Sequence, residues 1–586
     1  MCALLKRGAF DWTDVIMYTI GVWDGHDSGA VLLKDGEIAY AANEERFTKR
    51  KLEINFPSNA ISAAIRNAGI KPTDIERAAF TTTEFSKTIE RVFPIIKENY
   101  YQFRRRKMLK PGPFDIKHNH WLKYAMTSIG PLPGCVAVSR ASIAKNLMKS
   151  GIGNIKIDTV EHHTAHAATA AFTSGFDRAL VITLDGVGDG LCGSVSTFEN
   201  KKLERRLSIN ARDSLGMFFE QVTNIVGMRE LEDEGKVMAM ACYSYPFQQE
   251  ENKLHGFYDV TGTRIRARYG WHKQYRMLEN IAWSMPREQF SYMAQQILES
   301  CLVKFISNCI DRYGIRNIAL AGGVFANVKA NMLIRRMDNV DKWYVFPHMG
   351  DGGIALGSAL YSEYLHTGKC SYKFSAYTGE SYTQDHTEQI VKSDRSLSYS
   401  LETPMEQAAH AAELISKGNY LMWFQGRMEY GPRALGDRSI IAPADSESVK
   451  EKLNLYVKKR EWYQPFAPSV LESEVKNIVE YDGKGYDRYM TMAYMVKKDL
   501  RDKLKSVIHI DGSARPQMVG AENPTYMELL KKVRKETGLG IVLNTSFNLH
   551  GFPIVMTPED AIATMKATKT RYMFMNNLFI TNKAGV

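Results

Sequence analysis

Short apolar runs that end in glycine and aspartate turns dominate the first half of this chain. From Tyr18, the sequence YTIGVWDGHDSGAVLLKDGEIAYAANEERFT predicts an apolar strand, a polar turn at Asp24–Ser28, a second strand and a hairpin at Asp35–Gly36. A second strand–turn–strand unit is predicted over Ala179–Phe198, where an apolar run leads into DGVGDG. Further on, NIALAGGVFANVKANMLI predicts a strand that passes through a glycine turn into a helix.

This order of elements resembles the layout of the actin-like ATPases. In that fold two hairpins cradle phosphates, and a later glycine turn passes under the adenosine. Each glycine turn is a weak signal alone, but the three together in this order predict an actin-like α/β domain with a duplicated strand–turn–strand layout.

A chain of 586 residues exceeds what one hydrophobic core supports. We predict an N-terminal extension over 1–17, a first domain over 18–370 and a second over 371–586, because 365–385 is polar and rich in turns. Glu406–Leu421 then predicts a helix leading into a strand, the start of a second α/β domain. The basic and aromatic stretch 90–135 is expected to be a solvated insertion or a dimer contact, and 243–290 a substrate-side or lid segment.

Composition narrows the class of protein. The sequence is 44% hydrophobic and contains no apolar run near the roughly 18 residues of a membrane span. The N-terminus carries Asp11 and Asp14 and no secretory h-region. Seven scattered cysteines without a CxxC pair favour a reducing cytoplasm over a disulfide framework. The net charge of +11 suits anionic partners, including phosphate-bearing small substrates, but argues little for nucleic acid.

Two histidines four residues apart, His162 and His166, stand in the alanine-rich run EHHTAHAATA. This spacing places both imidazoles on one face of a helix. Alone, the pair is more typical of helix histidines satisfied by neighbours. Asp185 in LDGVGDG and Asp351 in MGDGG each follow an apolar strand at a tight turn, and the four residues together predict an N/O site for iron, manganese or zinc.

The second half of the chain concentrates cations in glycine- and proline-punctuated segments between apolar strands. Such a position favours a pocket over a solvated helix face, and arginine binds phosphate oxygens in a bidentate fashion. The asparagines and serine that end an apolar strand add neutral donors. We therefore predict an anion site, in preference to structural ion pairs, from Arg427, Arg433, Arg438, Lys458, Lys459, Arg460, Arg515, Asn544, Ser546 and Asn548.

Ten ordered motifs carry a resemblance to a known family. They are GHDSGA with ANEERFTKRK, HHTAH, DGVGDG, EDEGKVMAMA, AGGVFAN, GDGG, GRMEYGPRALGDRS, KKREWYQPFAPS, ARPQ and LNTSFN. With them the chain resembles the NodU/CmcH-type O-carbamoyltransferases, which tailor antibiotics and other natural products. The resemblance runs from about Tyr18 to the C-terminus.

The resemblance implies an actin-like N-terminal domain and a YrdC-like C-terminal domain. The C-terminal pocket would consume carbamoyl phosphate and ATP, with Mg²⁺, to form carbamoyladenylate. A hydroxyl of a small secondary metabolite would then attack the carbamoyl carbon in the N-terminal domain, and AMP would leave.

The family's functional residues fall on named positions. His162, His166, Asp185 and Asp351 resemble its metal ligands, with iron expected first and manganese or zinc as alternatives. His26 resembles a base for the acceptor hydroxyl, a phosphate hydrogen bond being the other role considered. Nucleotide contacts are expected at Gly186, Gly188, Asp189, Lys236, Gly322, Gly323 and Asn327. Carbamoyl phosphate contacts are expected at Arg433, Lys458, Arg460, Arg515, Asn544 and Ser546, of which Arg433 and Lys458 are also expected to be catalytic.

Some positions depart from the family pattern. Gln464 stands where the family often has arginine, which removes a phosphate contact that Arg427, Arg438 or Arg460 would have to replace. VMAMA replaces VMGLA, and the N-terminal extension and the 90–135 insertion lie outside the shared pattern.

Two other functions compete with this interpretation. One is threonylcarbamoylation of tRNA, which uses the same two domain types but usually on separate chains. The other, from a non-enzyme class, is an ATP-gated actin-like binding or chaperone module, which would have no use for a dense cation pocket. We expect a cytoplasmic enzyme without membrane or nucleic-acid partners, with a homodimer as one arrangement.

Overall fold

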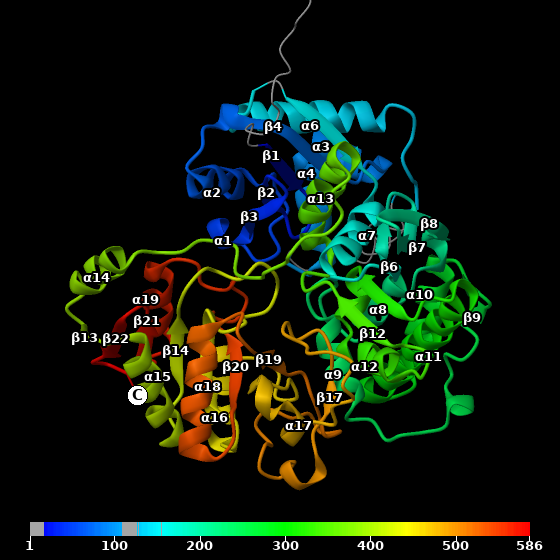
Figure 1. Ribbon diagram of the computed structural model, residues 1–586. Helices are drawn as coiled ribbons and strands as arrows, with labels where there is room; N and C mark the ends of the chain where they lie inside the picture. Colours follow the sequence, from blue (N-terminus) through cyan, green and yellow to red (C-terminus); the bar gives the residue numbers. More distant parts are fainter. Residues whose placement is uncertain (1–16, 108–125, 127, 154, 586) are drawn as a thin grey trace, which may run out of the picture.

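A computed structural model describes residues 17–107, 126, 128–153 and 155–585 of this α/β protein. The expected extension 1–17 therefore lies outside the described residues except for Met17, as does part of the 90–135 insertion. Figure 1 shows two sheets in the upper and right-hand parts of the molecule and a third sheet at the lower left. No helix among the described residues combines the length and apolar character that a membrane span needs.

The first two sheets share one strand order. The first sheet runs β3-β2-β1-β4-β5 and the second runs β8-β7-β6-β11-β12, so each consists of two antiparallel hairpin connections followed by parallel strands. The predicted hairpins are confirmed, including the turn at Asp35 and Gly36, which both adopt positive φ. The strands are β1 Tyr18–Trp23, β2 Gly29–Lys34, β3 Glu37–Asn43, β4 Ile75–Thr81, β5 Lys156–Val160, β6 Ala179–Gly188, β7 Leu191–Glu199, β8 Lys202–Asn210, β11 Asn317–Ala321 and β12 Lys342–Val345.

Two helices join these sheets face to face. Helix α7 (His162–Thr173) packs on β6 and β11, α13 (Ile354–Thr367) packs on β1 and β4, and the two helices pack on each other. Small residues explain the close approach, because a Cβ at Gly357 would lie 2.0 Å from the Ala165 carbonyl oxygen. The alanine-rich run around the histidine pair therefore serves helix packing, while its first turns face the site described below.

The C-terminal third forms an eight-stranded mixed sheet in the order β13-β22-β21-β14-β15-β20-β16-β19. Helices α15 (Pro404–Ser416) and α18 (Pro524–Thr537) pack together on one face of this sheet, and α15 leads into β14 as predicted. The strands are β13 Leu397–Leu401, β14 Leu421–Phe424, β15 Arg438–Pro443, β16 Ala467–Leu471, β19 Gln517–Val519, β20 Ile541–Ser546, β21 Tyr572–Met575 and β22 Leu578–Asn582.

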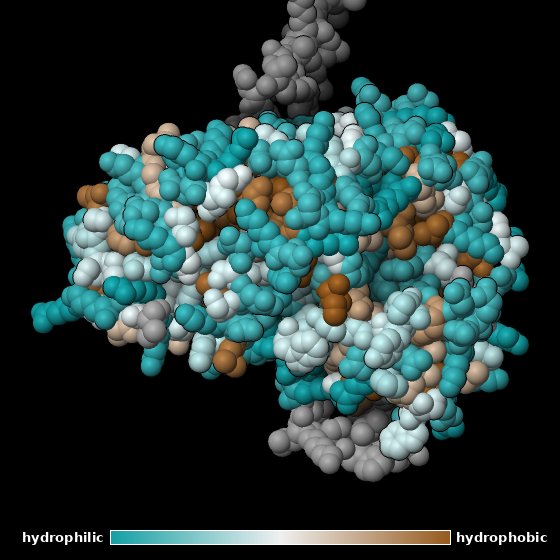
Figure 2. Space-filling model, turned by 90° about the horizontal axis from the view of Figure 1, so that it is seen from below, coloured by the Kyte–Doolittle hydropathy of each residue, from teal (hydrophilic) through white to brown (hydrophobic). Residues whose placement is uncertain are grey.

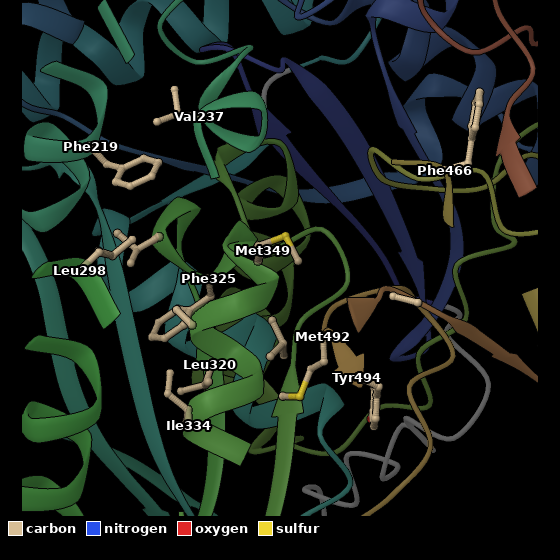
Figure 3. Packing of buried hydrophobic residues seen from close by; sticks show 14 of the residues in the cluster. Phe219, Val237, Leu298, Leu320, Phe325, Ile334, Met349, Phe466, Met492 and Tyr494 are labelled. Carbon is tan, nitrogen blue, oxygen red and sulfur yellow. The ribbon is translucent and has the colours of Figure 1, made fainter. Parts of the chain in front are cut away.

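One apolar cluster extends from the second sheet into the C-terminal sheet. It includes Leu320 and Phe325 from the N-terminal side and Phe466, Met492 and Tyr494 from the C-terminal side (Figure 3). Because protein interiors are close-packed, such a continuous cluster fixes the two halves relative to each other. The face seen in Figure 2 is mostly polar, with separate apolar patches.

The segment 243–290 does not form the lid that its polar sequence suggested. It contains the β9–β10 hairpin (Tyr258–Thr261 and Arg264–Ala267) and α10 (Trp271–Trp283). Leu254, Phe257 and Leu278 bury their side chains in the large apolar cluster, and no residue of the segment lines the cavity described below. Periodic apolar positions spread among polar ones concealed this packing role.

Candidate metal centre and cation-lined cavity

Four predicted ligands meet at one point between the first two sheets. His162 and His166 lie in the first turns of α7, Asp185 lies in β6, and Asp351 begins the turn before α13. His166 Nε2 lies 3.0 Å from Asp185 Oδ2 and 3.5 Å from Asp351 Oδ1, and His162 Nε2 lies 3.7 and 3.6 Å from the same two oxygens. Ligand atoms of all four residues lie within 4.8 Å of one another. Two imidazoles and two carboxylates in this arrangement fit a divalent transition metal.

The hydrogen bonds of His162 leave its Nε2 available to an ion. Its Nδ1 lies 2.9 Å from the Thr82 hydroxyl, which fixes the ring orientation. Its Nε2 is buried and has no hydrogen-bond partner in the described part of the chain, although it faces two carboxylates. Such a buried orphan nitrogen is expensive unless something binds it.

The two carboxylates have opposite pKa shifts. Burial acts to raise the pKa of Asp185, but contacts with His162 and His166 outweigh burial and hold that pKa well below its usual value. Burial, followed by the negative charge of Asp185, raises the pKa of Asp351 well above its usual value. Two carboxylates this close cannot both ionise cheaply without a cation between them.

The DGVGDG turn positions the histidine helix. Asp189 Oδ2 accepts a hydrogen bond of 2.9 Å from the His162 backbone N–H, and Asp189 Oδ1 accepts one of 2.7 Å from Thr83 N–H. A Cβ at Gly188 would lie 2.2 Å from the His162 ring, so only glycine fits there. Glu161 caps the helix by accepting from Thr164 N–H. Gly188 and Asp189, predicted as nucleotide contacts, therefore lie against α7.

The remaining glycine-turn residues also lie near this centre. Gly186 donates its N–H to Asp185 Oδ1 at 2.7 Å, and a Cβ at Gly323 would lie 2.9 Å from the same oxygen. Gly322 adopts a φ of +102°, and a Cβ there would meet the Leu184 carbonyl oxygen at 2.1 Å. Asn327 caps α12 (Val328–Arg336) through its side chain, which also bonds Gln295.

His26 lies beside the group formed by His162, His166, Asp185 and Asp351, which we call the metal-type centre. Its Nε2 lies 3.7 Å from Asp351 Oδ2. Burial, followed by the positive charges of Arg105 and Arg104, lowers the pKa of His26 well below its usual value. The imidazole is therefore neutral at neutral pH. A neutral imidazole can accept a proton from a hydroxyl or a hydrogen bond from a ligand.

The described part of the inserted stretch is partly buried, so it is not simply a solvated insertion: Tyr101, Arg104 and Arg105 are buried, whereas Phe93, Ile95 and Ile96 are exposed. The alternative of a dimer contact stays a prediction. Helices α3 (Phe85–Val92) and α4 (Pro94–Arg104) cover the first hairpin. Arg91 forms a bidentate ion pair with buried Asp24 at 2.8 and 2.9 Å, and the Tyr101 ring packs edge-on against His26 at 5.6 Å. Basic and aromatic residues of this stretch are thus part of the wall of the site. The sequence alone shows them only as a run of charged residues.

A second feature is a cavity of about 350 Å³ between the N-terminal sheets and the C-terminal sheet. Six predicted residues line it, together with Gln464, which replaces the family arginine. The sequence interpretation missed five more basic residues in its wall: Lys51, Arg229, Lys329, His509 and His550. Lys51 was within reach of prediction because it belongs to the motif run TKRK, whereas the others carry no local signal. The predicted lining residues are Lys236, Arg433, Arg460, Arg515, Ser546 and Asn548.

Three of the cavity arginines, Arg433, Arg460 and Arg515, are desolvated and form no ion pair with a described carboxylate, whereas Arg229 lies 3.6 Å from Glu232. Within the described residues, Arg433 and Arg515 have no hydrogen bond or ion pair, and Arg460 bonds only Asn454 and the Pro465 carbonyl. Burial lowers the pKa of both Arg433 and Arg460 to about 10. Burial and then the charge of Arg433 lower the pKa of Arg515 well below its usual range. Lys236, in contrast, pairs with Asp233 at 2.9 Å.

Two predicted pocket residues stand behind the cavity wall. Buried Lys458 donates to the Asn548 side-chain oxygen at 2.7 Å and to Ser546, which itself lines the cavity. Asn544 donates to Ser469, Gln517 and the Ala434 carbonyl, so its amide belongs to a buried network. Neither is among the lining residues.

Two of the three arginines considered as replacements for the Gln464 position cannot act there. Arg427 donates to the carbonyl oxygens of Gly379, Thr378 and Ala39. Arg438 donates to the carbonyls of Gln425 and Asp437 and stacks 3.6 Å from the Phe424 ring centroid. Arg460 alone of the three lines the cavity.

Comparisons with known proteins cover almost the whole chain. Residues 19–360 match the family described as carbamoyltransferase N-terminus, and residues 412–582 match carbamoyltransferase C-terminus. Nodulation protein NolNO of Sinorhizobium fredii is 30% identical over 96% of this chain and 79% of its own length. Nodulation protein U of the same organism is 33% identical over 91% of this chain and 94% of its own.

An uncharacterized protein of Synechocystis is 30% identical over 95% of both chains. Among solved structures, full-length HypF in its phosphate- and nucleotide-bound form is 14% identical, with a TM-score of 0.36 over 61% of this chain and 56% of that one. That likeness is too low to carry an argument. The two family matches and the long alignments suffice: this chain belongs to the carbamoyltransferase family and is a carbamoyltransferase enzyme.

Proposed function

We propose that this carbamoyltransferase is an ATP-dependent O-carbamoyltransferase that uses carbamoyl phosphate and passes through carbamoyladenylate. In this proposal the N-terminal part is an actin-like transfer domain and the C-terminal part a YrdC-like domain that forms the adenylate. The duplicated strand order of the first two sheets supports the actin-like assignment. The final acceptor is a hydroxyl of a small secondary metabolite.

The unpaired arginines of the cavity carry this proposal. Arg433 and Arg515 line a cavity of about 350 Å³, and neither forms an ion pair with a carboxylate in the described part of the chain. Burying such charges is costly unless an anion binds there. Carbamoyl phosphate and the phosphates of ATP with its Mg²⁺ are anions of the required kind, and arginine matches their oxygens.

The first stage requires only carbamoyl phosphate, water and ATP. Water cleaves carbamoyl phosphate to carbamate and phosphate. A carbamate oxygen then bonds to the α-phosphorus of ATP, and pyrophosphate leaves with the electron pair of the broken P–O bond. Arg433, Arg460 and Arg515 would stabilise the charge that develops on the phosphoryl oxygens in a water-poor cavity.

In the second stage the acceptor oxygen bonds to the carbamoyl carbon, and the bond from that carbon to the AMP phosphate oxygen breaks. The hydroxyl proton passes to a base, for which neutral His26 is the candidate. Tyr101 packs against the His26 ring and restricts its orientation.

His162, His166, Asp185 and Asp351 would hold one divalent metal, with iron as the first candidate and manganese or zinc as alternatives. The orphan Nε2 of His162 and the facing carboxylates fit such an ion. When bound, it would supply Lewis acidity toward an oxygen of the activated carbamate or the nucleotide.

The test is the release of pyrophosphate from ATP. The purified protein with ATP and Mg²⁺ should release pyrophosphate only when carbamoyl phosphate is added, and a screen of hydroxylated acceptors should find a product heavier by one carbamoyl group. Absence of carbamoyl-phosphate-dependent pyrophosphate release from a folded, metal-loaded protein would overturn the adenylate route.

A further inference from the structure

Arg105, just after α4 in the inserted segment, is a buried guanidinium with unused donors. Its exposed fraction is 2%. Nη1 donates to the Leu52 carbonyl oxygen at 2.8 Å, but Nε and Nη2 are buried and have no hydrogen-bond partner among the residues that the structure describes. The nearest carboxylate oxygen, Glu232 Oε1, lies 3.9 Å from Nε, which is beyond hydrogen-bonding distance.

The neighbouring arginine shows what a structural role in this segment looks like. Arg104 is equally buried, yet its Nε donates to Glu230 at 3.0 Å and its Nη2 donates to Glu220. Two carboxylates therefore neutralise Arg104 and account for its burial. Arg105 lacks an equivalent arrangement, so its remaining donors need another partner.

The position of Arg105 indicates what that partner is. On one side, Glu232 and Lys51, the neighbour of Leu52, line the cation-lined cavity. On the other side, the guanidinium lies 5.1 Å from the Tyr101 ring, and Tyr101 packs on His26 beside Asp351. Arg105 thus lies between residues of the cavity wall and Tyr101 at the edge of the metal-type centre, although Arg105 itself does not line the cavity.

We propose that Arg105 binds the phosphoryl group of carbamoyladenylate during its passage from the cavity to the metal centre. This assignment rests on the proposed function. The carbamoyl end of the intermediate is neutral and the adenosine is neutral, so the phosphoryl oxygens carry the only charge that a guanidinium can bind. Nε and Nη2 of one arginine form a fork that matches two such oxygens.

The binding of AMP and adenosine to the full-length protein tests this assignment. AMP carries the same phosphoryl group that the intermediate carries, and adenosine lacks it. Arg105→Gln should weaken AMP binding in titration calorimetry by about tenfold or more and change adenosine binding less than about twofold. Arg105→Lys should give a smaller loss for AMP. Arg106→Gln, at the exposed neighbouring arginine, serves as the matched control and should leave both affinities unchanged.

An unchanged ratio of AMP to adenosine affinity in Arg105→Gln would overturn the assignment. If that variant does not fold, Arg105→Lys decides, because a lysine that keeps the Leu52 contact but cannot form the fork must still lower the ratio. Failure of the proposed function looks different. In that case the wild-type protein releases no pyrophosphate with carbamoyl phosphate, whatever Arg105 binds.

Discussion

The metal-type centre and the cation-lined cavity both bury charge, but they differ in what surrounds that charge. At the metal-type centre, two imidazoles and two carboxylates contact one another from regular elements, α7 and β6, and from the turn before α13. In the cavity, Arg433, Arg460 and Arg515 come from loops, and among the described residues none of the three forms an ion pair with a carboxylate. The first set is complete once a cation binds, and the second once an anion binds.

This difference predicts that the metal-type centre and the cavity have separate roles in the reaction. Ligands on packed elements suit a fixed ion that stays through many turnovers, because the helices cannot shift without disrupting the α7–α13 contact. Loop-borne arginines suit substrates that enter and leave. We therefore expect variants in the two regions to affect different half-reactions.

The largest expected effect comes from His166→Ala. Loss of one of the two nitrogen ligands should remove the bound metal and reduce carbamoyl transfer by about 1000-fold or more, while pyrophosphate release changes less than about threefold. Elemental analysis of the purified protein and the two activity assays measure these effects.

His163→Ala is the control for that experiment. His163 is buried next to the ligands, but its Nδ1 bonds Thr183 and it lies outside the ligand set. It should keep its metal. Wild-type transfer by His166→Ala without bound metal would show that the four residues are not a metal site.

The sequence could predict the metal-type set because each ligand has a local signature. His162 and His166 share a helix face by their spacing, and Asp185 and Asp351 each stand where a strand meets a tight turn. The duplicated hairpins were predictable for the same reason, since apolar runs and turn residues are local signals.

The cavity was less predictable because its wall depends on partners far away in the sequence. Asn544 belongs to the right motif, yet Ser469 and Gln517 satisfy its amide. Arg427 and Arg438 look like their neighbour Arg433 in the sequence but bond backbone carbonyls. Burial of Arg91 and Tyr101 in the inserted segment likewise depends on packing over the first hairpin, which no charge pattern reveals.

Arg433→Ala is expected to have a smaller effect, and to impair adenylate formation where His166→Ala impairs carbamoyl transfer. Carbamoyl-phosphate-dependent pyrophosphate release should fall by about 100-fold. Metal content should not change. Because the substitution removes a desolvated charge that lacks an ion-pair partner, the unfolding temperature should stay the same or rise.

Arg427→Ala provides the contrast. Loss of its bonds to the Gly379 and Thr378 carbonyls should lower stability by about 1–2 kcal/mol, with a weaker effect on pyrophosphate release. A destabilised Arg433→Ala protein with full pyrophosphate release would contradict the assignment of the cavity as the anion site.

The smallest effect is expected from a substitution of Lys97, a buried lysine that has no ligand role in either region. This substitution tests how the protein tolerates a buried positive charge outside both sites. Lys97 donates to the Asp24 carbonyl oxygen, and burial followed by the charge of Lys87 lowers its pKa from 10.5 to about 7. Between these two pH values the unfolded chain binds more protons than the folded protein, so folding becomes more favourable as pH rises from 7 to 10.5.

The variant Lys97→Met has no group at this position that can titrate. It should therefore be more stable than wild type by about 2 kcal/mol at pH 7, and this advantage should shrink toward pH 10. Unfolding temperatures of both proteins at pH 7, 8.5 and 10 measure the trend, with exposed Lys149→Met as the control. A stability difference that stays constant over this range would mean that Lys97 keeps its proton in the folded protein. Asp24 would then neutralise the buried cations of the inserted segment as fully as a bound anion would neutralise the arginines of the cavity.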